Sequence, residues 1–162
     1  MRIEDAGERD LPGMLAIVNN VIATSTAIFS EAPLTLQEHR AWMAQRRQDG
    51  FPVLVARDGD DVLAYATYGE FRHHAGYRTT VEHTILVAEG VQRRGIGRAL
   101  IMRLLEIARE QGRHVMVAGV DAANESSIAF HEALGFVESA RMTEIAQKWG
   151  EWLDLVLLTR RV

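Results

Sequence analysis

The chain contains no cysteine among its 162 residues. This absence excludes a disulfide framework, a thiolate nucleophile and a zinc site with cysteine ligands. There are also only three prolines and no low-complexity tract, so no segment is marked as a linker. With no internal repeat either, the chain is expected to form a single domain over residues 1–162, long enough to bury a hydrophobic core.

Long apolar runs and a strong charge of either sign are missing as well. No stretch approaches the roughly 20 apolar residues of a membrane-spanning helix, and the acidic first residues do not resemble a signal peptide. The formal net charge of −4 argues against nucleic-acid binding, which needs a broad basic surface. We therefore expect a soluble, cytoplasmic protein with neither a membrane nor a nucleic acid as its partner.

Hydrophobic periodicity predicts four helices and a series of strands. The first helix is expected to follow Asp10 as its N-cap, with Pro12 in its first turn. Thr35 and Glu38 form the capping box of the second. The helices are expected over residues 11–23, 35–50, 95–111 and 124–135, and the strands on both sides of the Asp-Gly-Asp turn at 58–60 and over 79–90, 114–120, 137–146 and 151–159. Trp149 and Trp152 are expected to anchor the closing hairpin. The order predicts an α/β fold with helices on a central sheet.

The segment Val-Gln-Arg-Arg-Gly-Ile-Gly-Arg, residues 91–98, stands where a loop meets the third helix. A helix N-terminus presents unpaired N–H groups and the positive end of a dipole. Gly95 and Gly97 let the backbone approach an anion closely, and Arg93, Arg94 and Arg98 add positive charge. The pattern predicts a pyrophosphate site.

Two common phosphate-binding motifs do not match this loop. A P-loop requires Lys followed by Ser or Thr, and the dinucleotide fingerprint requires a third glycine where this chain has Leu100. The loop instead resembles the Q/R-x-x-G-x-G/A signature of the GNAT superfamily of N-acetyltransferases, over Gln92 to Gly97. The string NESSIAFHEALGF at 124–136 resembles that family's last helix, with His131 at the usual tyrosine position.

The histidine variant is similar to the branch with phosphinothricin and methionine sulfoximine/methionine sulfone acetyltransferases. The strings STAIFSE at 25–31, GEFRHHAGYRTTVEHT at 69–84 and KWGEWLD at 148–154 extend this resemblance over most of the chain. It implies a mixed, mostly antiparallel sheet flanked by helices, acetyl-CoA as co-substrate, no metal, and a homodimer. It is compatible both with resistance to a toxic amino acid and with the metabolism of one.

Acetyl transfer requires an amine that loses its proton, a polarised thioester carbonyl and a proton for the departing thiolate. The resemblance implies Glu82 as the general base. His131 is expected to protonate the thiolate; alternatively it is the base, with Glu82 orienting it or binding the substrate ammonium. The cofactor-binding residues are expected to be Ile85, Leu86 and Val87 through their main chain, the loop residues Arg93, Arg94, Gly95, Ile96, Gly97 and Arg98, and Asn124.

The acceptor is expected near the loop that precedes Glu82. Arg72 is suited to bind a substrate carboxylate in a bidentate manner, and Phe29 and Glu31 occupy the family's acceptor-covering loop. The predicted substrate-binding residues are Phe29, Glu31, Arg72, His73, His74, Glu82, His83 and Thr84. For the loop residues, solvation or simple packing is an equally good interpretation. Three histidines of this set suggest a metal, but no HExxH motif or carboxylate triad accompanies them, so no metal is expected.

The predicted function is therefore acetyl-CoA-dependent acetylation of the α-amine of a small amino acid such as methionine sulfone, methionine sulfoximine or phosphinothricin. A peptide or protein N-acetyltransferase is the alternative within the same class. A non-catalytic acyl-CoA-binding module is the alternative from another class, and the presence of both Glu82 and His131 argues against it.

Overall fold

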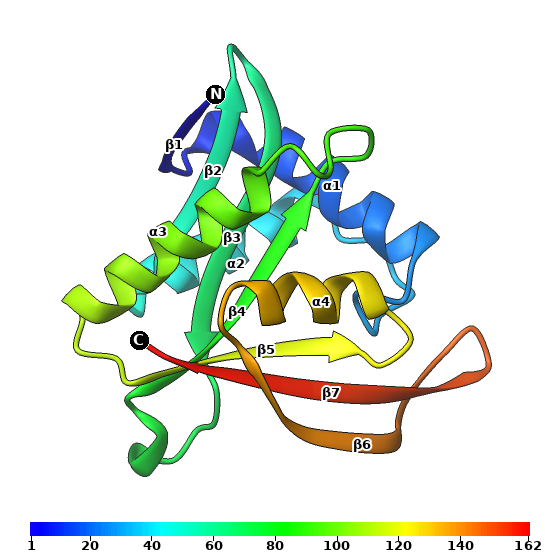
Figure 1. The fold of residues 1–162 in the computed structure, drawn as a ribbon. Coiled ribbons are helices and arrows are strands. Elements are labelled where there is room, and N and C mark those ends of the chain that lie inside the picture. Colours follow the sequence, from blue (N-terminus) through cyan, green and yellow to red (C-terminus); the bar gives the residue numbers. More distant parts are fainter.

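A computed structural model describes residues 1–162, in which seven strands form one sheet with helices on both faces (Figure 1). The strands are β1 (Arg2–Asp5), β2 (Val53–Asp58), β3 (Asp61–Glu70), β4 (Thr80–Val87), β5 (Val115–Asp121), β6 (Val137–Lys148) and β7 (Glu151–Arg161). The helices are α1 (Leu11–Thr24), α2 (Leu36–Gln48), α3 (Ile96–Glu110) and α4 (Glu125–Ala133), with short 3-10 turns η1 (Glu8–Asp10) and η2 (Ala75–Tyr77). The strand order is β1-β2-β3-β4-β5-β7-β6, and only the β4–β5 pair is parallel. The expected α/β fold with a mostly antiparallel sheet is confirmed.

Local capping signals explain where the helices begin. Thr35 accepts a hydrogen bond from the Glu38 amide at 3.2 Å, and the Glu38 carboxylate accepts one from the Thr35 amide at 2.7 Å. Asn124 accepts from the Ser127 amide at the start of α4. Gly95 precedes α3 with φ +79°, a conformation that a residue with a β-carbon rarely adopts. These three helices therefore begin at the capping signals identified in the sequence.

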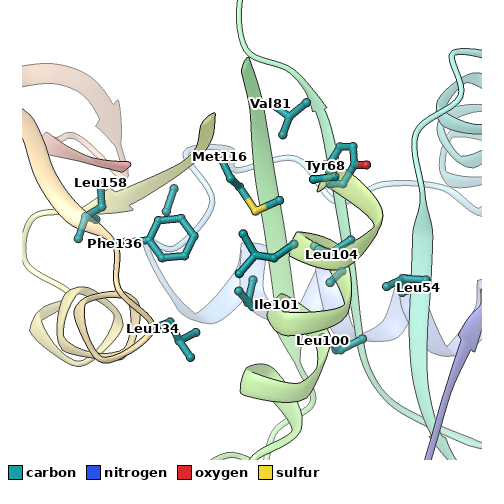
Figure 2. Packing of buried hydrophobic residues seen from close by; sticks show 14 of the residues in the cluster. Leu54, Tyr68, Val81, Leu100, Ile101, Leu104, Met116, Leu134, Phe136 and Leu158 are labelled. Carbon is teal, nitrogen blue, oxygen red and sulfur yellow. The ribbon is translucent and has the colours of Figure 1, made fainter. Parts of the chain in front are cut away.

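Two hydrophobic clusters fix α3 to one face of the sheet and α1 and α2 to the other. Leu100, Ile101 and Leu104 of α3 pack on the first face against strand residues such as Tyr68 and Met116 (Figure 2). The second cluster is formed by Leu11, Met14, Ile17, Val18, Ile22 and Met43 of the helices with Val53, Val55, Tyr65 and Leu86 of the strands. Because successive side chains of a strand point to opposite faces, neighbours in β4 are divided between the two clusters.

Three expectations were incomplete or wrong. Strand β1 was not expected, because this edge strand carries one apolar residue, Ile3. Asp10 precedes α1 but makes no side-chain cap there; its carboxylate accepts from the Gly7 amide at 2.7 Å and lies 3.3 Å from Arg57. Trp149 and Trp152 do not anchor the closing hairpin, because their side chains lie outside the core, with exposed fractions of 49% and 61%.

The end of the β6–β7 hairpin is attached to α1 by the only lysine of the chain. Lys148 is 1% exposed, and its ammonium donates hydrogen bonds to the carbonyls of Ile22, Ser25 and Ile28 at 2.7–2.9 Å. The last carbonyls of a helix carry partial negative charge and lack intrahelical donors, so a cation there satisfies them. Lys148 therefore fixes the end of α1 and the following loop.

Replacement Lys148→Met is expected to lower the free energy of unfolding by about 2–4 kcal/mol, because three charge-assisted hydrogen bonds are lost and buried carbonyls stay unpaired. Denaturant titration measures this change. Arg103→Met removes an exposed cation that pairs with Glu106, and it should cost less than about 1 kcal/mol. Equal losses in the two variants would contradict the anchoring role of Lys148.

Candidate active site

The site is created where β4 and β5 diverge. The two strands pair only from Thr80–Val115 to His83–Ala118, although β4 continues to Val87 and β5 to Asp121. The outer edge of β4 remains paired with β3 and that of β5 with β7. The main-chain groups of residues 84–87 that face β5 are therefore not used by the sheet, and residues 85–87 are the ones expected to bind the cofactor through their main chain.

A cavity of about 260 Å³ occupies this divergence. It is lined by Ala27, Ile28, Glu82, His83, Thr84, Ile85, Leu86, Gly119, Val120, Asp121, Asn124, Ser127 and His131. The lining residues come from β4, β5, α4 and the loop after α1 (Figure 1). Of the predicted substrate-binding residues, the cavity brings together Glu82, His83 and Thr84.

Glu82 is half-buried and its carboxylate extends over β5. A β-carbon built on Gly119 would lie 2.8 Å from Oε1 of Glu82, so the missing side chain leaves space for the carboxylate. Burial raises the pKa of Glu82, while the positive charges of Arg72 and Arg46 oppose this rise. A carboxylate with a raised pKa beside an open cavity is suited to accept a proton near neutral pH.

His131 lies on the other face of the sheet and forms a buried pair with His83. Their Nε2 atoms are 3.2 Å apart and the rings are stacked at 5.1 Å. Nδ1 of His131 lies 2.7 Å from the Ser127 carbonyl, which can only accept, so Nδ1 carries a proton. In the neutral ring Nε2 of His131 is then the acceptor and Nε2 of His83 is the donor.

Burial keeps both imidazoles neutral. It lowers the pKa of His131, with the hydrogen bond to Ser127 opposing the shift, and it lowers that of His83 to about 3, assisted by the neighbouring His131. Glu82 and His83 are consecutive in β4 and point to opposite faces. The alternative in which Glu82 orients the His131 ring is therefore not supported by this arrangement.

A larger groove of about 570 Å³ continues from the cavity to the glycine loop. Nine of the ten predicted cofactor-binding residues line it: Ile85, Leu86, Val87, Arg93, Gly95, Ile96, Gly97, Arg98 and Asn124. Arg94 is exposed on the same loop and does not line the groove. Residues not expected from the sequence also contribute, among them Val21, Ser25, Ala27 and Phe130.

The chemistry of the groove suits acetyl-CoA. Gly95 has no side chain to cap the first turn of α3, so the N–H groups there are free to bind a pyrophosphate. A β-carbon on Gly97 would lie 3.3 Å from Phe130, which shows how closely the helix start approaches the groove wall. The unpaired edge of β4 offers hydrogen bonds to an amide-containing chain in the manner of an added strand.

The remaining predicted acceptor residues lie outside the cavity lining. Arg72 is exposed with its guanidinium 5.3 Å from the Phe71 ring, and His73 is exposed and pairs with Glu70 at 3.2 Å. His74 is exposed, and Phe29 is partly buried in the loop after α1. Glu31 accepts a hydrogen bond from the Trp149 amide at 3.3 Å, so it connects that loop to the hairpin.

The loop after α1 is held at the cavity by Asp121 and Lys148, neither of which was expected from the sequence to contribute to the site. Thr26 donates a hydrogen bond to Asp121, which also accepts from the Ala123 amide at 3.0 Å. Lys148 binds the same loop through the carbonyls of Ser25 and Ile28. These contacts join segments far apart in the chain, and no local pattern indicates them.

No group of three or more His, Cys, Asp or Glu side chains is arranged to hold a metal ion. The helices are also too short or too polar for any of them to span a membrane.

Comparison with known proteins agrees with this geometry. Residues 15–136 match the model of the acetyltransferase (GNAT) family. An L-methionine sulfoximine/L-methionine sulfone acetyltransferase of Pseudomonas aeruginosa is 45% identical over 157 residues, covering 96% of this chain and 91% of that protein.

Solved structures show the same fold over nearly the whole chain. A ribosomal-protein-alanine N-acetyltransferase from Brucella melitensis has a TM-score of 0.98 and 41% identity, with 100% of both chains covered. A phosphinothricin acetyltransferase from Sinorhizobium meliloti in complex with acetyl-CoA has a TM-score of 0.95 and 31% identity, covering 99% of this chain and 88% of that one. The chain belongs to the GNAT family of acetyltransferases, which use acetyl-CoA as co-substrate.

Proposed function

We propose that this enzyme acetylates the α-amine of a small amino acid such as methionine sulfone, methionine sulfoximine or phosphinothricin. The carrying observation is the half-buried Glu82 in a cavity of about 260 Å³. Burial raises the pKa of this carboxylate, and the positive charges of Arg72 and Arg46 lower it. A small acceptor that carries an ammonium and a carboxylate next to each other suits this arrangement. The names of the Pseudomonas and Sinorhizobium relatives support the same substrate class.

Acetyl-CoA supplies the activated acetyl group. Glu82 takes one proton from the acceptor ammonium, and the free amine then attacks the thioester carbonyl. Main-chain N–H groups on the free edge of β4, within residues 85–87, stabilise the developing negative charge on the carbonyl oxygen. The glycine loop, with Arg93 and Arg98, holds the pyrophosphate and so fixes the thioester end in the divergence.

A second proton leaves the nitrogen and ends on the sulfur. His131 lines both the cavity and the groove, so it lies where acceptor and thioester meet. We assign it the transfer of this proton: Nδ1 stays bound to the Ser127 carbonyl, and Nε2 takes up and delivers the proton. The 3.2 Å contact of Nε2 with His83 must open for this step.

The name of the Brucella relative, a ribosomal-protein-alanine N-acetyltransferase, favours a second candidate within the same class, a peptide or protein N-acetyltransferase. CoA release from acetyl-CoA, measured with methionine sulfone and with an alanine-starting peptide, separates the two. We expect rapid release with the sulfone alone, since the cavity is small. Release with the peptide alone would reassign the acceptor, and tight acetyl-CoA binding without release would favour a non-catalytic binding module.

Two substitutions should separate chemistry from cofactor binding. Glu82→Gln removes the proton acceptor, so kcat should fall by about 100-fold or more while the Kd for acetyl-CoA stays unchanged. Gly97→Leu places a side chain in the groove and should raise that Kd strongly. Steady-state kinetics and calorimetric titration measure the two effects. An unchanged kcat in Glu82→Gln would remove Glu82 as the base.

We further infer a homodimer that forms through the β6–β7 hairpin. Three large apolar side chains near its turn are exposed: Ile145 at 54%, Trp149 at 49% and Trp152 at 61%. Exposed apolar groups of this size are typical of protein–protein contacts.

The use of acetyl-CoA also favours the cytoplasm as the place of action, which cell fractionation would test.

Trp152→Glu is expected to convert the dimer into a monomer, because a charge would be buried without a partner at the contact. Analytical ultracentrifugation measures the mass in solution. Leu36→Glu, which changes an exposed leucine at the start of α2, serves as the matched control and should remain dimeric. A wild-type protein that sediments as a monomer would disprove the dimer.

A further inference from the structure

Glu82 is flanked on both sides by glycine. Gly69 of β3 is its direct cross-strand partner, and Gly119 of β5 lies beneath its carboxylate. Neither glycine has a positive φ, so backbone conformation does not require them. Glycine at these two positions instead leaves space on the strands on either side of Glu82, the proposed base.

The space above Gly69 is filled by a side chain from another element. A β-carbon on Gly69 would collide with Nη1 of Arg46 and lie 2.5 Å from Cζ and 3.0 Å from Nη2. Arg46 belongs to α2, which covers the same face of the sheet to which Glu82 points. Its guanidinium is therefore placed directly over the strand residue that pairs with Glu82.

Aromatic rings hold this guanidinium in place. Its Cζ lies 6.0 Å from the centroid of the Trp42 ring and 5.9 Å from that of Phe51. Contacts of this kind orient a cation without neutralising its charge. Arg46 is partly buried, whereas Arg72, the other cation that acts on Glu82, is exposed on the loop after β3. Solvent and salt screen the charge of Arg72 more than that of Arg46.

The other titratable groups around Arg46 and Glu82 do not replace this charge. Asp49, Glu70 and His73 line the same hollow as Arg46, and the negative charge of Asp49 acts on the guanidinium together with that of Glu82. Asp121 of β5 lines the same cavity but is engaged by Thr26 and the Ala123 amide. His83 and His131 lie on the other face and are neutral. Arg46 and Arg72 are therefore the cations that oppose the effect of burial on Glu82.

We propose that Arg46 is a positioning residue for the acetyl transfer: its guanidinium, seated over Gly69, supplies a fixed positive charge that keeps the Glu82 carboxylate ionised until it receives the proton of the acceptor ammonium. This assignment rests on the proposed role of Glu82 as the base. It also gives Gly69 a function, because any larger residue there would displace the guanidinium.

The test removes the charge in two independent ways. Arg46→Met deletes the cation, and Gly69→Ala moves it, since the flexible end of Arg46 must yield to the new methyl group. Loss of a nearby cation favours the protonated carboxyl, so the pKa of Glu82 should rise in both variants. The acidic limb of the kcat/KM profile, where activity appears as Glu82 loses its proton, should then shift to higher pH.

Two readouts follow these variants. One is the pH profile of kcat/KM with the accepted amino acid; the other is the carbon-13 NMR titration of the Glu82 carboxyl, which does not depend on turnover. The double variant should shift no further than either single one, because both remove the same charge. Arg46→Lys keeps a positive charge and should therefore show a smaller shift than Arg46→Met. Arg40→Met, which removes an exposed cation on the same helix that pairs with Glu8, should leave both readouts unchanged.

Each other result has a defined meaning. An unshifted Glu82 titration in Arg46→Met and Gly69→Ala would overturn the proposal. A loss of kcat/KM by the same factor at every pH would also overturn it and would assign Arg46 to binding of the acceptor carboxylate. If Glu82→Gln keeps the acidic limb, the base assignment fails, while the NMR titration still reports whether Arg46 controls the charge of Glu82.

Discussion

Pairing between β4 and β5 stops halfway along the two strands, and the rest of the site depends on this divergence. The sheet hydrogen bonds that would have joined residues 84–87 to β5 are left unmade, which places polar main-chain groups at the centre of the fold. Both strands are still held by their outer neighbours, so the opening is rigid. A gap inside a continuous sheet lets a ligand reach main-chain groups and side chains of both faces at once.

The divergence also separates the ionisable groups of the site. Glu82 points to the face covered by α1 and α2, where Arg46 lies over its cross-strand partner Gly69, whereas His83 is buried against His131 of α4 on the other face. One face is thus polar and charged, and the other keeps its imidazoles neutral. Small residues on the strands make this division possible, because a side chain at position 69 or 119 would occupy the space of Arg46 or of the Glu82 carboxylate.

Features that depend on residues close together in the chain could be predicted from the sequence. Features that depend on how helices and strands pack against one another could not. The capping box at Thr35, the Asn124 cap and the glycine loop before α3 are local, and the structure contains all three. The position of Arg46 over Gly69 depends on how α2 crosses β3. The exposure of Trp152 likewise depends on which side of the hairpin faces the core, and two tryptophans alone do not reveal it.

Lys148 has a chemical consequence beyond its three hydrogen bonds. It is the only lysine in the sequence, so no other side chain carries a primary amine. With its ammonium buried against three carbonyls, an enzyme that binds a reactive thioester presents no lysine side chain for that thioester to acylate by accident. Because the Lys148 side chain is buried, an amine-reactive reagent can label it only after the hairpin detaches from α1. Labelling of Lys148 therefore reports this local opening.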